Sequence, residues 1–327
     1  RLDLALASVL TPGSLVATVV SGIVMGLSGG VAIALPYLLP FLVGLAILED
    51  TGYLPRMAYI LDGLMHRIGL HGKSVLPIML GYGCSVPAIM ATRILESGRD
   101  RRLTTALAAF IPCSARTVVI YGLVAAFVGP LPALAIYLLN LVVVAALGTV
   151  LARSVRGASP GLILEIPDLR LPVPRTLLAK TWLSLKEFIV IAWPLLILSS
   201  AVLGLLEWMQ ADRLLNAALS PLTVTALGLP AAVGVSLIFG ILRKELTLVM
   251  LVQALGLTEL AQVPSVMDTG QLVTFTLFVV FYVPCVATVA AMAREVGWRT
   301  TGAISALAVA LATVIGVLSR LGFALAG

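Results

Sequence analysis

Three cysteines are the residues of this sequence best suited to bind a metal ion. Cys84 lies in the segment Gly81-Tyr-Gly-Cys-Ser-Val-Pro87, and Cys113 and Cys285 each follow a proline. Thiolate sulfur suits borderline or soft cations such as Fe(II), Zn(II) or Cu(I), and it binds Na⁺, K⁺ or Mg²⁺ poorly. The glycines allow close approach of the backbone, and Pro87 frees a carbonyl, so this segment could hold an ion. The alternative is that Cys84 is a small residue at a tight helix crossing.

Oxygen ligands could complete such a site. Ser85 follows the first cysteine directly, and Glu49 and Asp50 close an apolar run. Carboxylates at a pore mouth would attract a cation and partly dehydrate it. Glu49 and Asp50 could equally be a solvated helix end.

Charged residues inside apolar segments need partners. Glu245, within Arg243-Lys-Glu245, could be a ligand, a gate or a counter-ion of Lys244, and a structural ion pair is the default interpretation. Arg116, one turn after Cys113, is expected to be buried against an acidic group or a carbonyl. We therefore leave Arg116 outside the predicted metal shell.

The elements that must position these residues are membrane helices. Hydrophobic residues make up 60% of the 327 positions and charged residues 11%, against about 25% charged in a soluble domain. Two apolar stretches, 74–95 and 231–255, contain glycine, proline or charged residues, so we predict broken or re-entrant segments there. Candidate membrane spans are predicted near 14–29, 31–49, 103–128, 131–153, 186–208, 272–293 and 302–325. The sequence thus predicts an all-α, polytopic membrane protein.

One pattern occurs twice along the chain. The matched positions are Gly69 and Gly228, Gly81 and Gly240, and Pro112-Cys113 and Pro284-Cys285. Lys and Arg flank the first broken segment, which places both of its ends in the cytoplasm, whereas residues 257–270 after the second have none. The copies therefore face opposite ways, as in transporters whose discontinuous inverted repeats meet near the midplane. The alternative is two duplicated bundles that share a pattern for packing alone.

The predicted domains follow from this repeat. They are an N-terminal membrane segment (1–30), a first repeat (31–153), a basic cytoplasmic linker (154–182) and a second repeat (183–327). The net charge of +6 reflects topology rather than a nucleic-acid partner. The segment Gly69–Ser74 is similar to a phosphate-binding loop, but Arg67 stands where the first glycine is required, so we expect no nucleotide binding. The chain begins at Arg1 and looks like a piece of something longer.

Several motifs, in this order, resemble the ferrous-iron transport protein B (FeoB) family over nearly the whole chain. They are Leu48-Glu-Asp-Thr-Gly-Tyr53, Ile68-Gly-Leu-His-Gly-Lys-Ser74, Gly81-Tyr-Gly-Cys-Ser-Val-Pro-Ala-Ile-Met-Ala-Thr-Arg93, Pro112-Cys-Ser-Ala-Arg116, Arg243-Lys-Glu245 and Val283-Pro-Cys-Val-Ala-Thr288. The resemblance implies two gate-type repeats that move Fe(II) into the cytoplasm, with Cys84, Cys113 and Cys285 on the iron path. Ser85 stands where the family commonly has Asn, which removes an amide ligand but keeps an oxygen.

The resemblance also implies a transporter rather than an enzyme, multi-pass in a prokaryotic inner membrane, with Fe(II) as substrate and no tightly bound cofactor. Family members usually begin with a cytoplasmic G domain, which this chain lacks. A separate or missing GTP-binding domain and a small cytoplasmic accessory protein are therefore implied partners, and homo-oligomerisation is left open. Two other functions stay open: transport of an organic solute such as a nucleoside, and a non-transporting membrane scaffold.

Overall fold

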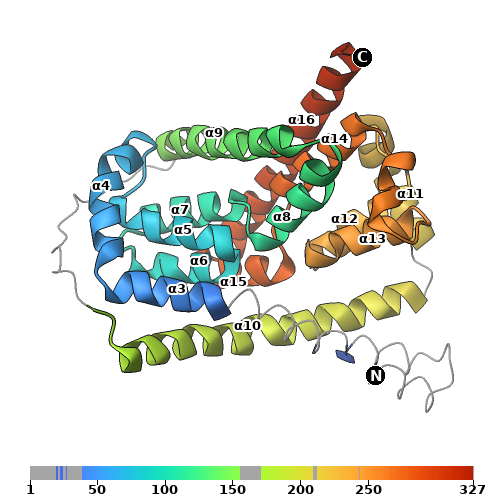
Figure 1. Ribbon diagram of the computed structural model, residues 1–327. Coiled ribbons are helices and arrows are strands. Elements are labelled where there is room, and N and C mark those ends of the chain that lie inside the picture. Colours follow the sequence, from blue (N-terminus) through green and yellow to red (C-terminus); the bar gives the residue numbers. More distant parts are fainter. Residues whose placement is uncertain are drawn as a thin grey trace.

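In the computed structural model, the described residues are 39–154, 171–208, 212–242 and 244–326, with four isolated positions before residue 39. All regular structure in these ranges is helical (Figure 1). Four helical segments are long and apolar enough to cross a membrane: Gly98–Ala125, Pro130–Ser154, Thr269–Val296 and Trp298–Leu325. The prediction of an all-α, multi-pass membrane protein is confirmed. The span predicted at 14–29 and the start of the one at 31–49 lie outside the described ranges.

The first half of the chain surrounds a short helix pair, α5 and α6, which pack against each other on either side of Cys84. Its helices are α3 (Leu39–Asp50), α4 (Tyr53–Arg67), α5 (Val75–Gly83), α6 (Ser85–Ala91), α7 (Gly98–Phe110), α8 (Ser114–Val119) and α9 (Pro130–Ser154). Short 3-10 helices form at Gly72–Ser74 and Thr92–Ile94, and a π-helix at Ile120–Ala125 continues α8.

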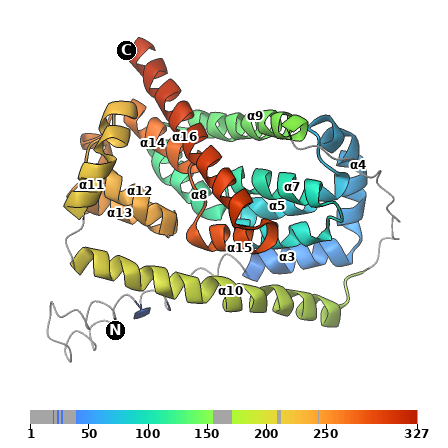
Figure 2. The ribbon, with the colours of Figure 1, turned by 180° about the vertical axis from the view of Figure 1, so that it is seen from behind.

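The second half contains another packed pair, α12 and α13. Its helices are α10 (Pro174–Trp208), α11 (Asp212–Ser220), α12 (Val233–Leu242), α13 (Thr247–Ala254), α14 (Thr269–Phe281), α15 (Val286–Val296) and α16 (Trp298–Ala326), with a π-helix at Pro221–Ala226 and 3-10 helices at Lys244–Leu246 and Leu260–Ser265. Helix α10 begins within the stretch predicted as a linker. Helices α9 and α10 lie along opposite edges of the molecule, with the broken helices between them (Figures 1 and 2).

Each half contains two helix breaks. The breaks predicted within 74–95 and 231–255 are confirmed, at Cys84 and between α12 and α13. The spans predicted at 103–128 and 272–293 are confirmed by the apolar segments Gly98–Ala125 and Thr269–Val296, but each contains a break that was not predicted, because α7 stops at Phe110 and α14 stops at Phe281 before the chain resumes as α8 and α15. Pro112 and Pro284 explain both interruptions: proline lacks a backbone N–H and forces the preceding residue out of the helical region.

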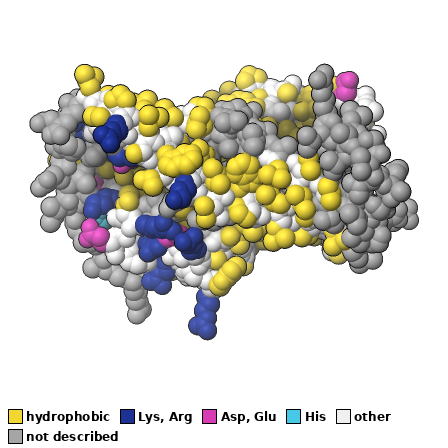
Figure 3. All heavy atoms as spheres, turned by 90° about the horizontal axis from the view of Figure 1, so that it is seen from below, with side chains coloured by type: hydrophobic (Ala, Val, Ile, Leu, Met, Phe, Trp, Pro, Cys, Tyr) yellow, Lys and Arg dark blue, Asp and Glu magenta, His cyan; other side chains and the backbone are white. Residues whose placement is uncertain are grey.

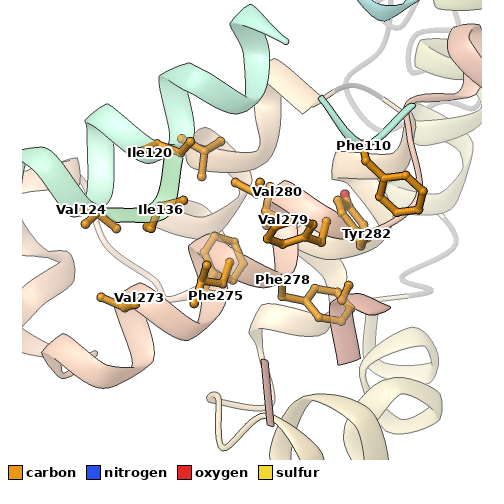
Figure 4. Close-up of a cluster of buried hydrophobic side chains, with 14 of the residues drawn as sticks. Phe110, Ile120, Val124, Ile136, Val273, Phe275, Phe278, Val279, Val280 and Tyr282 are labelled. Atoms are coloured by element: carbon orange, nitrogen blue, oxygen red, sulfur yellow. The ribbon is translucent and has the colours of Figure 1, made fainter. Parts of the chain in front are cut away.

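Helix α14 is the centre of the main hydrophobic core. Every residue from Leu272 to Phe281 is buried, as expected for a helix that is apolar on all sides. Phe275 and Val279 pack with Ile120 and Ile136 from the first half (Figure 4). The two halves therefore share one core, which includes Phe110 and Tyr282 at the breaks.

Two glycines at matched positions adopt the same left-handed backbone. Gly69 has φ of 78° and Gly228 has φ of 68°. A Cβ atom added to Gly69 would lie 2.1 Å from the Cβ of Ala152 in α9. This glycine lets the chain leave α4 close to α9 before entering α5.

Replacing Gly69 with Ala should lower the free energy of unfolding by about 2 kcal/mol or more, because left-handed strain and the overlap with Ala152 add. Gly302→Ala is the matched control, since a Cβ added there, within α16, meets nothing within 4 Å. That control should be neutral or stabilising by up to about 1 kcal/mol. Thermal unfolding in detergent measures both, and an equal Tm for the two variants would contradict the prediction.

Candidate functional site

All three cysteines occupy the same kind of position: each is the N-cap residue of the helix that resumes after a break. Cys84 precedes α6, Cys113 precedes α8 and Cys285 precedes α15. All three have extended backbone, are partly buried and lie outside any disulfide. The three cysteines thus share one local backbone arrangement, at the start of a helix that follows a break.

Arg116 joins the breaks of the two halves. Its Nη1 donates to the carbonyls of Ala109, at 2.8 Å, and Ile111, at 3.0 Å. Its Nη2 donates to the carbonyl of Tyr282 at 3.1 Å. The first two carbonyls end α7 and the third ends α14, and the side chain is fully buried. The expected carbonyl partner of Arg116 is thus confirmed, and the guanidinium satisfies helix ends that have no water to bind.

Asn140 and Lys244 supply further donors to the same helix ends. Asn140 Nδ2, from α9, donates to the carbonyl of Phe110 at 3.0 Å. Lys244 Nζ lies 3.5 Å from the carbonyl of Val279 and 4.4 Å from the centre of the Tyr282 ring. The broken ends of α7 and α14 are therefore held by an amide and two buried cations, which suits the negative end of a helix dipole.

Tyr282 also connects the two breaks of the second half. Its hydroxyl donates to the carbonyl of Leu237 in α12 at 3.0 Å. A Cβ atom added to Gly240 would lie 2.4 Å from this hydroxyl, so Gly240 leaves the space that the tyrosine occupies. The packing of Tyr282 thus explains why position 240 is a glycine, which the match with Gly81 in the sequence did not reveal.

Cys113 and Cys285 lie beside the buried cations. Both thiols are within electrostatic range of Arg116 and of Lys244, and they are within range of each other. The Sγ of Cys285 is 3.0 Å from the hydroxyl of Thr288, a hydrogen bond within the first turn of α15. The two Pro-Cys motifs therefore lie near each other, beside Arg116 and Lys244.

Cys84 reaches the same region through apolar contacts. Cys84 and Cys285 pack against one hydrophobic cluster, which includes Ile89 of α6 and Met292 of α15. Within the part of the chain that the structure describes, no three His, Cys, Asp or Glu side chains are close enough to hold a metal ion. The thiols thus border one region without forming a closed ligand shell.

The predicted oxygen ligands are spread over three places. Ser85 is buried next to Cys84 as the first residue of α6. Glu49 pairs with Lys180 Nζ at 3.0 Å, and Asp50 accepts a hydrogen bond from the backbone N–H of Val173 at 2.8 Å, so these carboxylates join α3 to the start of α10.

Distance separates these carboxylates from the thiols. Phe41, in α3, packs against Gly83 next to the break at Cys84, so closely that a side chain at Gly83 would overlap its ring. Glu49 lies eight residues further along α3, or about 12 Å. Glu245 lies in the 3-10 helix Lys244–Leu246, but its side chain, and with it the predicted pair with Lys244, is outside the described part.

Sequence reasoning missed Asn140, Tyr282 and Thr288. A signal for two of them was present, because Tyr282 precedes Cys285 by three residues and Thr288 follows it by three. Around Cys113 the same offsets give Phe110, whose carbonyl is capped by Asn140, and Arg116. A polar residue one turn after an N-cap cysteine is therefore the detectable feature of these breaks.

Two family models match this chain. The model of the Gate family, described as nucleoside recognition, matches residues 31–127 and 189–299, and the model of the ferrous iron transport protein B C terminus matches residues 133–183. No solved structure matches significantly.

Curated relatives carry one name. The Fe(2+) transporter FeoB of Synechocystis sp. is 32% identical over 295 residues, which cover 85% of this chain and 47% of the relative. That of Staphylococcus aureus (strain COL) is 32% identical over 289 residues, covering 81% of this chain and 42% of the relative. That of Salmonella typhimurium is 37% identical over 164 residues, covering 49% and 21%. The chain spans about half the length of the first of these relatives, or less.

The contacts of Arg116 predict a graded loss of stability. Arg116→Lys keeps the charge, but one ammonium cannot serve carbonyls on both breaks, so we expect the free energy of unfolding to fall by about 3 kcal/mol or more. Tyr282→Phe should cost about 1 kcal/mol. The exposed Thr313→Ala should change little. Thermal unfolding in detergent gives the order, and an Arg116→Lys variant as stable as Thr313→Ala would refute it.

Proposed function

Because this chain belongs to the Gate family and, within it, to the membrane part of the ferrous iron transport protein B family, we propose that it carries Fe(II) across the inner membrane into the cytoplasm. One observation carries the proposal: the three cysteines are N-caps at helix breaks, around one region between the halves. Unwound backbone and helix ends near the midplane are where discontinuous-helix transporters bind their solutes.

The chemistry of the site favours a borderline cation. Sulfur is available from three cysteines at helix breaks, and the thiols of Cys113 and Cys285 lie near the basic side chains of Arg116 and Lys244. Fe(II) accepts sulfur ligands, whereas Mg²⁺ and Ca²⁺ require oxygen. Since the thiols do not close a shell in this conformation, a transported ion would be held by a rearranged and transient set.

The two halves are proposed to be inverted repeats. Each contains a packed broken pair, α5 with α6 and α12 with α13, followed by a helix interrupted at a Pro-Cys motif. Lysine and arginine side chains gather on one half of the face in Figure 3, which supports a cytoplasmic position for this end under the positive-inside rule.

The oxygen ligands are assigned separate roles in this proposal. Ser85, and Glu245 in the second broken segment, are proposed to contact the ion near the thiols. Glu49 and Asp50 lie at the end of α3 with Lys180, and they are proposed to line the inner mouth. A GTP-binding domain, a small cytoplasmic accessory protein and a second copy of the chain are proposed as further partners.

Transport of an organic solute such as a nucleoside is the weaker candidate. The Gate family description and the presence of Asn140 and Tyr282 near the breaks favour it. However, Asn140 Nδ2 and the Tyr282 hydroxyl are both bound to backbone carbonyls of the breaks. These groups therefore hold the protein's own helix ends.

Uptake of radioactive Fe(II) into proteoliposomes under anaerobic, reducing conditions tests the function. We expect Cys84→Ser and Cys113→Ser to lower the initial rate at least about tenfold, because loss of a soft ligand weakens the site. Gly302→Ala should transport like the wild type. Excess Mn(II) and Zn(II) report selectivity. Undiminished uptake in both cysteine variants would show that the thiols only pack.

A further inference from the structure

A buried carboxylate joins the two halves at the end of the molecule where lysine and arginine side chains gather (Figure 3), which we call the basic end. Glu295, in the last turn of α15, has a side chain 2% exposed. It accepts a hydrogen bond from Arg93 Nε at 2.8 Å and another from Arg101 Nη2. The side chains of these arginines are 41% and 33% exposed, so both cations reach solvent while the anion does not. We call the group Arg93, Arg101 and Glu295 the clasp.

Each clasp residue shares a helical segment with one of the cysteines, which lies at or next to the other end of that segment. The pairs are Cys84 and Arg93 along α6 and the 3-10 helix after it, Arg101 and Cys113 along α7, and Cys285 and Glu295 along α15. Nine to twelve residues separate the members of each pair, or about 13–18 Å at helical rise. This is about half of a 30 Å hydrocarbon core. The clasp therefore lies about half a membrane away from the thiols.

Apolar side chains fill the space between the thiols and the clasp. Helices α6, α7 and α15 pack on one another, and Ile89, Ala106 and Met292 lie in one buried cluster. Ile89 and Met292 have no exposed surface. An ion leaving the thiols toward the basic end would have to separate these helices.

We propose that the clasp is the inner gate of the ion path and that it is closed in this structure. This inference rests on the proposed function, because it assumes that the ion binds at the thiols. Opening moves α15 away from α6 and α7, which breaks the contacts of Glu295 and widens the apolar cluster beneath them. The arginines are already partly exposed, so they can exchange the carboxylate for water, provided that the movement of α15 exposes Glu295 as well and leaves no unpaired buried charge. A cation released toward this end would also compete with them for Glu295.

Thiol labelling tests the gate without any iron flux. The wild-type chain in vesicles is treated from the basic end with a charged, membrane-impermeant maleimide, and the labelling rates of Cys84 and Cys285 are read by mass spectrometry. We expect Glu295→Gln and Arg101→Gln to speed this labelling at least about tenfold, because a broken buried pair favours the open form. Glu96→Gln, which removes an exposed pair with Lys73, is the matched control and should leave the rate unchanged.

The possible outcomes distinguish failure of the gate proposal from failure of the proposed Fe(II) transport. Unchanged labelling in both clasp variants overturns the gate, since the clasp would then be a fixed structural pair. An equal increase in Glu96→Gln also overturns it, since any charge change on this face would then raise the labelling rate. Faster labelling in the clasp variants of a chain that does not transport Fe(II) would support the gate and reject the cargo. If Glu295→Gln fails to fold, Arg101→Gln and Arg93→Gln decide.

Discussion

The centre of this molecule depends on the buried guanidinium of Arg116. Two prolines interrupt α7 and α14 inside the membrane, and each interruption leaves carbonyls that no helical N–H can reach. Arg116 donates to the ends of both helices, with Asn140 and Lys244 beside it. The same breaks place Cys113 and Cys285 at the N-termini of the helices that follow. Satisfying the backbone at the breaks and presenting the thiols are thus one structural solution.

Buried charged side chains join the two halves at two levels. Arg116 and the Tyr282 carbonyl form the central level, and the clasp around Glu295 forms the other at the basic end. Apolar side chains of α6, α7 and α15 separate the two levels. If the thiols bind the ion, the molecule has a binding level and a gate level on the same three helical segments. A shift of α15 would then change both together.

The helical architecture could be predicted from the sequence more completely than the side-chain contacts could. The breaks at 74–95 and 231–255 were readable because glycine, proline and charged residues interrupt apolar runs there. The breaks at Pro112 and Pro284 were missed because the surrounding runs are long enough to span a membrane, and their length outweighed one proline each. A carbonyl partner for Arg116 was expected, but its contact with Tyr282 joins residues 166 positions apart, which no local pattern encodes. Glu295 was not singled out in the sequence, since its burial by other helices is a tertiary property.

The central claim is that the cysteines at three separate breaks form one metal site. Anaerobic titration of the purified chain with Co(II), a spectroscopic substitute for Fe(II), tests it through the sulfur-to-cobalt charge-transfer absorption. The account predicts one ion per chain, with an absorption that weakens in each of Cys84→Ser, Cys113→Ser and Cys285→Ser. A wild-type chain without this absorption, or three variants whose absorption is as strong as that of the wild type, would contradict it.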